Sequence, residues 1–116
     1  MAFRIRDLKG RQRWAGGTLR GRDGTARALG PGDIEFQPGR QWTSPRTGTA
    51  YPVQWQVRAA DRNFELQPLM DDQENDARLS AGAIYWEGAV RANQGGVDVG
   101  GGYLELTGYG ERLRLR

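Results

Sequence analysis

Apolar and polar residues alternate along much of the chain, and short clusters of Gly, Pro, Asn and Asp interrupt the alternation. A period of two residues is typical of β-strands with one buried face, and the clusters mark the turns between strands. Residues 50–58 are the clearest strand, because their apolar members share one side: Tyr51, Val53, Trp55 and Val57. Pro52 lies near the start of this segment, where a missing amide donor is tolerated.

The N-terminal part of the chain predicts two strands. Residues 2–8 place Phe3 and Ile5 on one face and arginines on the other, so we expect the charged face to point to solvent. Residues 12–20 predict a second strand, in which Gly16-Gly17 indicates a bulge or a bend. Turns are expected at Lys9-Gly10, at the hairpin sequence Asp23-Gly24 and at residues 29–33.

The second half of the chain continues the pattern. Alternation recurs in four further segments, at residues 64–70, 82–92, 103–109 and 112–116. Turns are expected at residues 61–63 and 93–96, where Asn, Asp and Gly gather. Residues 71–80 form the only long polar stretch, and we expect either a loop or a single helical turn there.

The whole pattern predicts an all-β fold of roughly eight to ten antiparallel strands. Glycine supplies 18 of the 116 residues, four Trp and four Tyr are present, and strong helix formers seldom occur in runs. Closing the sheet into a barrel removes the exposed edges that a flat sheet must protect, so we favour a lipocalin-like β-barrel over a sandwich. A chain of this length forms one domain, residues 1–116.

The composition excludes several kinds of chemistry. The chain contains no histidine and no cysteine, which removes the commonest general base, thiolate ligands and disulfides. Serine nucleophiles are weakened as well, because no histidine is present to activate them. No cluster has the spacing of metal ligands, and we expect neither a metal nor a cofactor. Acid–base chemistry therefore falls to carboxylates or tyrosines.

The charge is positive and uneven. The net charge is +3, with seven cations in residues 1–22 and six carboxylates in residues 61–76. The excess is small and aromatic residues are not interleaved with the arginines, so we expect solvated strand faces and no nucleic-acid partner. No segment approaches the roughly 20 apolar residues of a membrane span, and the N-terminus lacks the apolar centre of a signal peptide. We expect a soluble chain whose compartment stays open.

Four motifs carry a resemblance to a known family: WTSPRTGTAYPVQW (42–55), PLMDDQE (68–74), YWEGAV (85–90) and GGYLELTGYG (101–110). In this order and at similar spacing, they resemble the C-terminal part of the carotenoid hydratase/AttH-like proteins. Weaker similarity reaches back to GGTLRGRDGTAR, so the resemblance covers about residues 12–110.

The resemblance implies a lipocalin-like β-barrel that is one of two in a longer chain. Family members are often described as secreted or periplasmic hydrolases, and characterised relatives add water to isoprenoid double bonds or shape pericyclic ring closures. They share a pocket for a greasy, polyene-like ligand, much of it near the domain junction. The N-terminal barrel is absent from this sequence. The partners implied are a hydrophobic small molecule and either a second lipocalin-like domain or a homodimer.

Hydration of an alkene requires an acid that protonates carbon, inside a cavity that protects a carbocation. Without His or Cys, the acid must be an Asp or Glu whose pKa is raised by apolar surroundings. Glu87 and Glu105 are the first candidates, because each shares a strand face with tyrosine in an aromatic-rich segment. Asp72, like Glu74 in the same motif, is the next candidate. Candidate ligand contacts are the aromatic residues Trp42, Trp55, Tyr85, Trp86, Tyr103 and Tyr109.

Two arrangements of the C-terminal strands stay open. In the first, the faces that carry Glu87 and Glu105 line the lumen. In the second, these carboxylates lie outside and pair with Arg91, Arg112 or Arg114, while the core is formed by Ile84, Trp86, Val90, Leu104 and Leu106. Asp72 has a corresponding alternative, in a solvated loop or as a cap of a helical turn.

Three functions fit the sequence. The first is a ligand-binding lipocalin-like domain of a hydratase- or cyclase-type protein. The second is a non-catalytic barrel that stabilises a partner domain, and the third is a small enzyme that acts alone. The lumen separates them, because a ligand-binding domain or an enzyme needs an open cavity, whereas a lumen filled by Trp and Leu fits the structural role.

Overall fold

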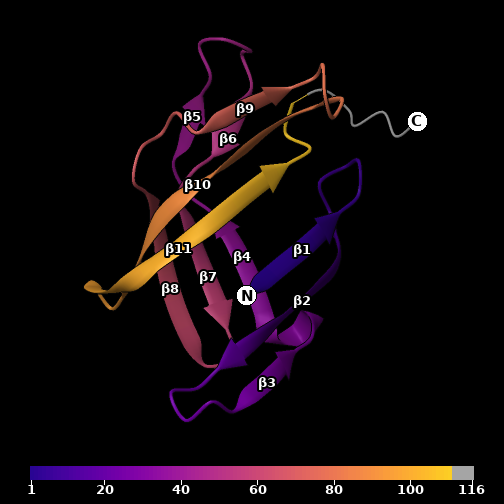
Figure 1. Ribbon diagram of the computed structural model, residues 1–116. Helices are drawn as coiled ribbons and strands as arrows, with labels where there is room; N and C mark the ends of the chain where they lie inside the picture. Colours follow the sequence, from indigo (N-terminus) through magenta and orange to yellow (C-terminus); the bar gives the residue numbers. More distant parts are fainter. Residues whose placement is uncertain (111–116) are drawn as a thin grey trace.

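The computed structural model describes residues 1–110, so the strand expected at residues 112–116 lies outside the described part of the chain. Within residues 1–110 the chain forms strands and one short 3-10 turn, η1 (Pro31–Asp33), which confirms the all-β prediction (Figure 1). The strands are β1 (Ala2–Arg6), β2 (Gln12–Arg20), β3 (Ala26–Leu29), β4 (Ile34–Pro38), β5 (Gln41–Thr43), β6 (Ala50–Pro52), β7 (Trp55–Ala59), β8 (Arg62–Pro68), β9 (Glu74–Ala77), β10 (Ala83–Gln94) and β11 (Val97–Thr107).

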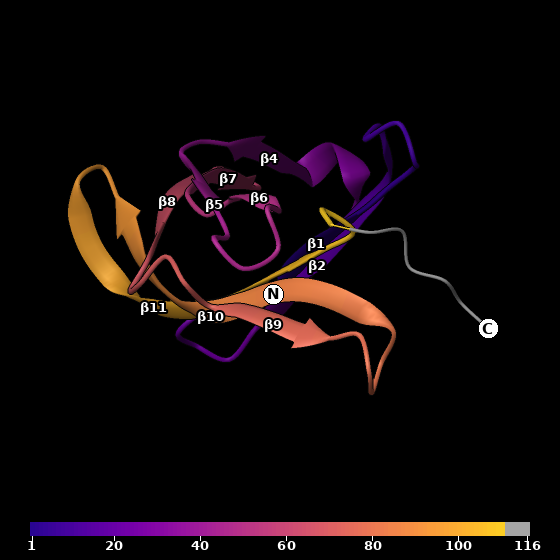
Figure 2. The ribbon, with the colours of Figure 1, turned by 90° about the horizontal axis from the view of Figure 1, so that it is seen from above.

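All the strand pairs are antiparallel. The largest sheet has the order β11-β10-β8-β7-β4, with β9 paired to β10 beside β8. Strands β1, β2 and β3 form a second sheet, and β5 and β6 form a hairpin. Seen from above, the large sheet curls round from β4 to β11 (Figure 2). Among the described residues no hydrogen-bonded ladder joins β11 to β1, so the curled sheets form an open half-barrel of the lipocalin-like kind.

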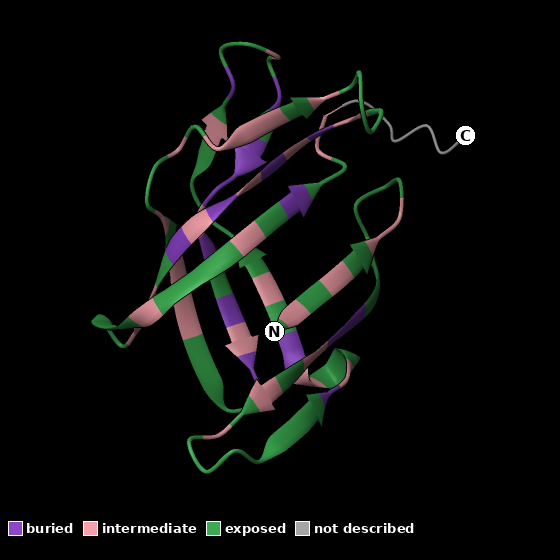
Figure 3. Cartoon of the chain, viewed as in Figure 1, coloured by how far each residue is buried: buried purple, intermediate pink, exposed green. Residues whose placement is uncertain are grey.

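The main core lies inside this curl, where the buried stretches of the strands meet (Figure 3). It is built from alternate residues of β7, β10 and β11 and from the chain around β6: Tyr51, Val53, Trp55, Val57, Ile84, Trp86, Val90 and Leu106. A second, smaller cluster lies under β2 and consists of Ala15, Leu29, Ile34 and Ala59. The alternation of the sequence therefore marks the buried face correctly in β7 and β10.

Two segments differ from the sequence predictions in the strands that they form. The strand expected at residues 50–58 is split into β6 and β7, because Val53 and Gln54 turn their amides to the carbonyl of Arg40 instead of a neighbouring strand. The four residues of β9 form a strand where we expected a loop or a helical turn, and they pair with the first part of β10. Neither difference changes which side of these segments is buried.

A glutamine side chain replaces the missing strand along the middle of β10. Strand β9 pairs with residues 83–86 and β8 with residues 90–93, which leaves an interval between them. Gln73 fills it, because its side chain accepts a hydrogen bond from the Ala89 amide and donates to the Met70 carbonyl. A Cβ on Gly88 would lie 2.0 Å from this amide group, so a larger residue at this position would displace the Gln73 side chain.

The faces of β1 are the reverse of the expected arrangement. Phe3 and Ile5 are 41% and 55% exposed, whereas Arg4 and Arg6 are half-buried and point into the curl. Phe3 pairs in register with Gly16 and packs on Trp14, at 5.3 Å between ring centroids, on the outer face of the small sheet. The bulge of β2 also lies at the Arg6 end of the ladder rather than at Gly16-Gly17.

Candidate functional site

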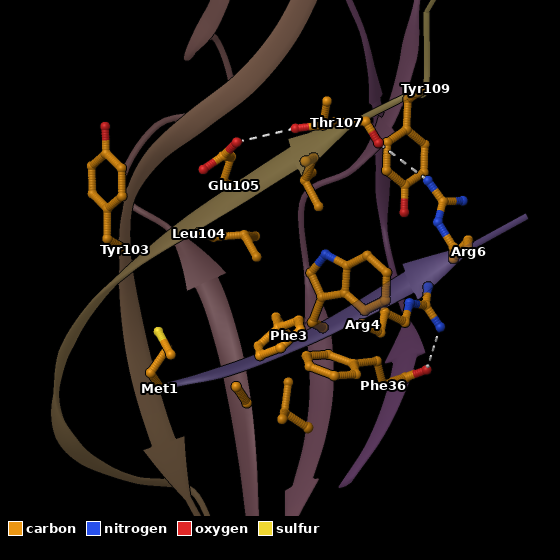
Figure 4. A pocket seen from close by; sticks show the side chains of 14 residues that line it. Met1, Phe3, Arg4, Arg6, Phe36, Tyr103, Leu104, Glu105, Thr107 and Tyr109 are labelled. Carbon is orange, nitrogen blue, oxygen red and sulfur yellow. Dashed lines mark hydrogen bonds between the residues drawn. The ribbon is translucent and has the colours of Figure 1, made fainter. Parts of the chain in front are cut away.

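A cavity of about 470 Å³ lies in the half-barrel between β1 and β11, the two edge strands that do not pair (Figure 4). A volume of this size is typical of small-molecule sites in proteins. Its inner walls are apolar and come from strands β4, β7 and β11: Phe36, Trp55, Val57, Leu104 and Leu106. These side chains belong to the main core or pack against it, so the cavity is an extension of the core that opens between two strands.

Two arginines of β1 line the same cavity. The Arg4 guanidinium carbon lies 5.0 Å from the centre of the Trp55 ring and 5.7 Å from that of Phe36, and Nη1 donates to the Phe36 carbonyl at 3.3 Å. The Arg6 guanidinium lies 4.1 Å from the centre of the Tyr109 ring, and Nη2 donates to the Thr107 carbonyl at 3.4 Å. Contacts between a guanidinium and an aromatic face are favourable and become stronger away from water.

Within residues 1–110 neither of these arginines forms an ion pair, because every ion pair found in that range is made by some other arginine. Sequence reasoning missed Arg4 and Arg6 as site residues, because alternation identifies two faces of β1 without identifying the inner one. Two arginines spaced two residues apart were the available signal, since that spacing puts both on one face.

The two leading carboxylate candidates lie on the outer face of β10 and β11. Glu87 and Glu105 pair directly in the ladder, while their neighbours Trp86 and Leu106 pair on the buried face. This placement matches the arrangement in which the carboxylates lie outside the core. The proposed pairing with arginine differs, because Arg91 contacts Asp98 instead, and Arg112 and Arg114 lie outside the described residues. Glu105 still borders the cavity, and its Oε1 accepts a hydrogen bond from the Thr107 hydroxyl.

Asp72 lies at the surface, away from the cavity. Its carboxylate accepts two hydrogen bonds of 2.7 Å from the Arg46 guanidinium, and these lower the pKa of Asp72. Asp71 is held in the same way by Arg40, with the same effect on its pKa. Both ion pairs tie the β5–β6 region to the loop before β9.

The six aromatic candidates separate into three groups. Trp55, Tyr103 and Tyr109 line the cavity, although Tyr103 is largely exposed at its rim. Trp86 is completely buried and donates its indole N–H to the Asp71 carbonyl, while Trp42 stacks on Tyr51 behind the cavity. Tyr85 lies on the outer face with Glu87, since the two residues alternate with buried Ile84 and Trp86.

A second polar centre, around Glu74, supports the fold beside the cavity. The Glu74 side chain is fully buried and accepts hydrogen bonds from the hydroxyls of Ser44 and Thr47, at 2.6 and 2.7 Å. Burial beside this carboxylate raises the pKa of the Tyr51 hydroxyl. Glu74 therefore fixes the turn of the WTSPRTG motif onto β9, which is a structural role.

Other kinds of site find no support in the described residues. Residues 1–110 contain no group of three or more Asp, Glu, His or Cys side chains arranged to hold a metal ion. No helix in the same range is long and apolar enough to cross a membrane.

Comparison with known proteins identifies the family. The model of the AttH-like family matches residues 1–109. A crystal structure of a candidate AttH from Nitrosomonas europaea superposes with a TM-score of 0.89 at 47% sequence identity. The match covers 94% of this chain and 34% of that protein, so the chain spans about a third of its relative's length. Among curated proteins none matches the chain. The chain therefore belongs to the AttH-like family.

Proposed function

We propose that this chain is a ligand-binding domain, and that the cavity between β1 and β11 holds a hydrophobic, isoprenoid or polyene-like molecule. The observation that carries the proposal is the cavity itself, about 470 Å³ with walls that include Phe36, Trp55 and Leu104. Burying apolar ligand surface against such walls contributes roughly 25 cal/mol per Å² before the costs of binding. Membership of the AttH-like family supports this choice, since the resemblance implies a pocket for a greasy ligand.

We further propose Glu105 as the acid of a hydratase- or cyclase-type reaction in the protein that contains this domain. Of the three candidate carboxylates it is the one that borders the cavity. Glu87 stands opposite it in the ladder and is its proposed companion. Asp72 is the weakest of the three, because its lowered pKa disfavours the protonated form that an acid needs.

The test of binding is calorimetric titration of the chain with all-trans retinol, a neutral isoprenoid polyene. Replacing Leu104, which lines the cavity, by Trp should fill the space and raise Kd at least tenfold. Replacing Val97, which is exposed and does not line the cavity, by Trp is the matched control and should leave Kd unchanged. Binding by a Leu104→Trp variant that equals the parent's, with the same circular dichroism spectrum, would contradict the proposal.

A second candidate function is that of a non-catalytic module that docks a partner domain. The outer face of the small sheet favours it, because Phe3, Ile5 and Trp14 leave an apolar patch on the surface. The relative's additional length is consistent with a covering domain. The two functions are compatible, since the patch adjoins the cavity only at Phe3, which borders it, whereas Ile5 and Trp14 do not line it.

A further inference from the structure

The inward orientation of Arg4 and Arg6 runs against the energetics of folding. Burying an apolar side chain such as Phe3 or Ile5 stabilises the fold, so an ordinary strand with this alternation turns those two residues inward. In β1 they stay exposed, and two guanidinium groups occupy the inner face instead. A local conflict of this kind is expected at functional sites, where the cost is offset by binding.

Both guanidiniums keep most of their hydrogen-bonding capacity unused. Each has five N–H donors, and the structure gives each arginine one hydrogen bond, to the carbonyl of Phe36 for Arg4 and of Thr107 for Arg6. No carboxylate within residues 1–110 forms an ion pair with either group. Glu105 borders the cavity from the outer face of β11, and its side chain accepts a hydrogen bond from Thr107 on its own strand. Half-buried cations normally have partners, and because none is found within residues 1–110, an anion bound in the cavity would complete this site.

The rest of the cavity complements an apolar body. Trp55, Val57, Leu104 and Leu106 supply apolar lining, and Glu105, the one carboxylate that borders the cavity within residues 1–110, belongs to the outer face of β11. A ligand that satisfies both parts therefore has an anionic head and an apolar chain or ring system. Carboxylate is the head group that matches a guanidinium in planar, two-pronged geometry.

We propose that the cavity is specific for an amphipathic carboxylate, with its head on Arg4 and Arg6 and its apolar body against Trp55, Val57 and Leu104. This inference rests on the proposed ligand-binding function and adds the chemical class of the ligand. It assigns Arg4 and Arg6 as specificity-determining residues. The head then lies near β1, and the body lies against the apolar residues of β7 and β11.

The test compares all-trans retinoic acid with all-trans retinol, which share one polyene body and differ in the head group. The chain should bind retinoic acid at least tenfold more tightly than retinol, by calorimetry at low ionic strength. Added salt should weaken the binding of retinoic acid and leave that of retinol unchanged.

Variants assign the effect to the arginines. The double variant Arg4→Gln, Arg6→Gln should lose the preference for retinoic acid and still bind retinol. The control Arg22→Gln changes an exposed arginine in the turn after β2, outside the cavity, and should keep the preference. If the double variant unfolds by circular dichroism, Arg4→Lys and Arg6→Lys retain the charge without the planar fork and should show a reduced preference.

The outcomes are distinct. Equal binding of the two retinoids by the parent chain would overturn the carboxylate inference and leave the proposed function intact. A preference that survives in the folded double variant would overturn the assignment to Arg4 and Arg6. Absence of binding for both retinoids would count against the proposed function and the inference together.

Discussion

At the scale of single residues, Glu74 is the clearest case of a charge placed by its neighbours. The sequence motif marked it as a possible acid, but its carboxylate is fully buried and accepts hydrogen bonds from Ser44 and Thr47. Hydrogen bonds to a charged group contribute about 1.5–3 kcal/mol each, and buried donors left unpaired are costly. Glu74 therefore stabilises the junction between the β5–β6 hairpin and β9.

Replacing Glu74 by Ala should lower the free energy of unfolding by about 2–3 kcal/mol, because the buried Ser44 hydroxyl and the half-buried Thr47 hydroxyl both lose a hydrogen bond to the carboxylate. Urea denaturation followed by tryptophan fluorescence measures the change. Glu35→Ala is the matched control, since that side chain is exposed and forms a 3.5 Å surface ion pair with Arg58. Its effect should stay within about 0.5–1 kcal/mol. Equal losses in the two variants would mean that the buried contacts of Glu74 add nothing.

Replacing Arg46 by Gln should raise the pKa of Asp72, because the two hydrogen bonds from the guanidinium are what lowers it. A lowered folded pKa means that the ion pair stabilises the fold above the ordinary value of 3.8 and that this contribution is lost as pH falls through the folded pKa. The variant should therefore lose less stability on acidification. Carboxyl NMR titration measures the pKa directly, and Asp71, which is held by Arg40, serves as the internal control. An unchanged midpoint for Asp72 would contradict the assignment.

At the scale of strands, the sequence predicted where most elements lie and which side of β7 and β10 is buried. The pairs Asp23-Gly24 and Gly95-Gly96 also form turns, with positive φ at the glycines. The predicted orientation of β1 was wrong. Alternation with a period of two defines two faces of a strand, but packing against other strands, here β4 and β7, decides which face is buried. Strand β9 was missed because Glu74 and Asp76 lack apolar alternation, and its pairing depends on β10, which is distant in sequence.

A substitution in β10 tests the role of the Gln73 side chain, which links the Ala89 amide to the Met70 carbonyl. Gly88→Ala should destabilise the fold by about 1–3 kcal/mol, because the new methyl group displaces the Gln73 amide and leaves the Ala89 N–H without its acceptor. Gly101→Ala on the neighbouring strand is the control, since its Cβ would meet only the Val90 carbonyl at an ordinary 3.7 Å. Thermal unfolding measures the effect of both variants, and equal midpoint temperatures would exclude a stabilising role for the Gln73 side chain.

At the scale of the whole molecule, the apolar outer face of β1 and β2 should make the chain associate or bind hydrophobic dyes. Light scattering and the fluorescence of an anilinonaphthalene sulfonate dye measure the two effects. The double variant Phe3→Thr, Ile5→Thr should reduce both, whereas Leu69→Thr, at an exposed site outside this face, should not. A monomeric parent chain that binds no dye would remove the support for a docked partner domain.

We propose that ligand enters the curl between β1 and β11 and does not bind the outer apolar face. Methyl NMR of the chain during titration with retinol tests it most directly, because methyl groups report each location separately. The methyl signals of Val57, Leu104 and Leu106 should shift and saturate together, since these side chains line the cavity, while those of exposed Ile5 and Val97 should stay in place. Shifts confined to Ile5, with the cavity methyls unmoved, would contradict binding inside the curl.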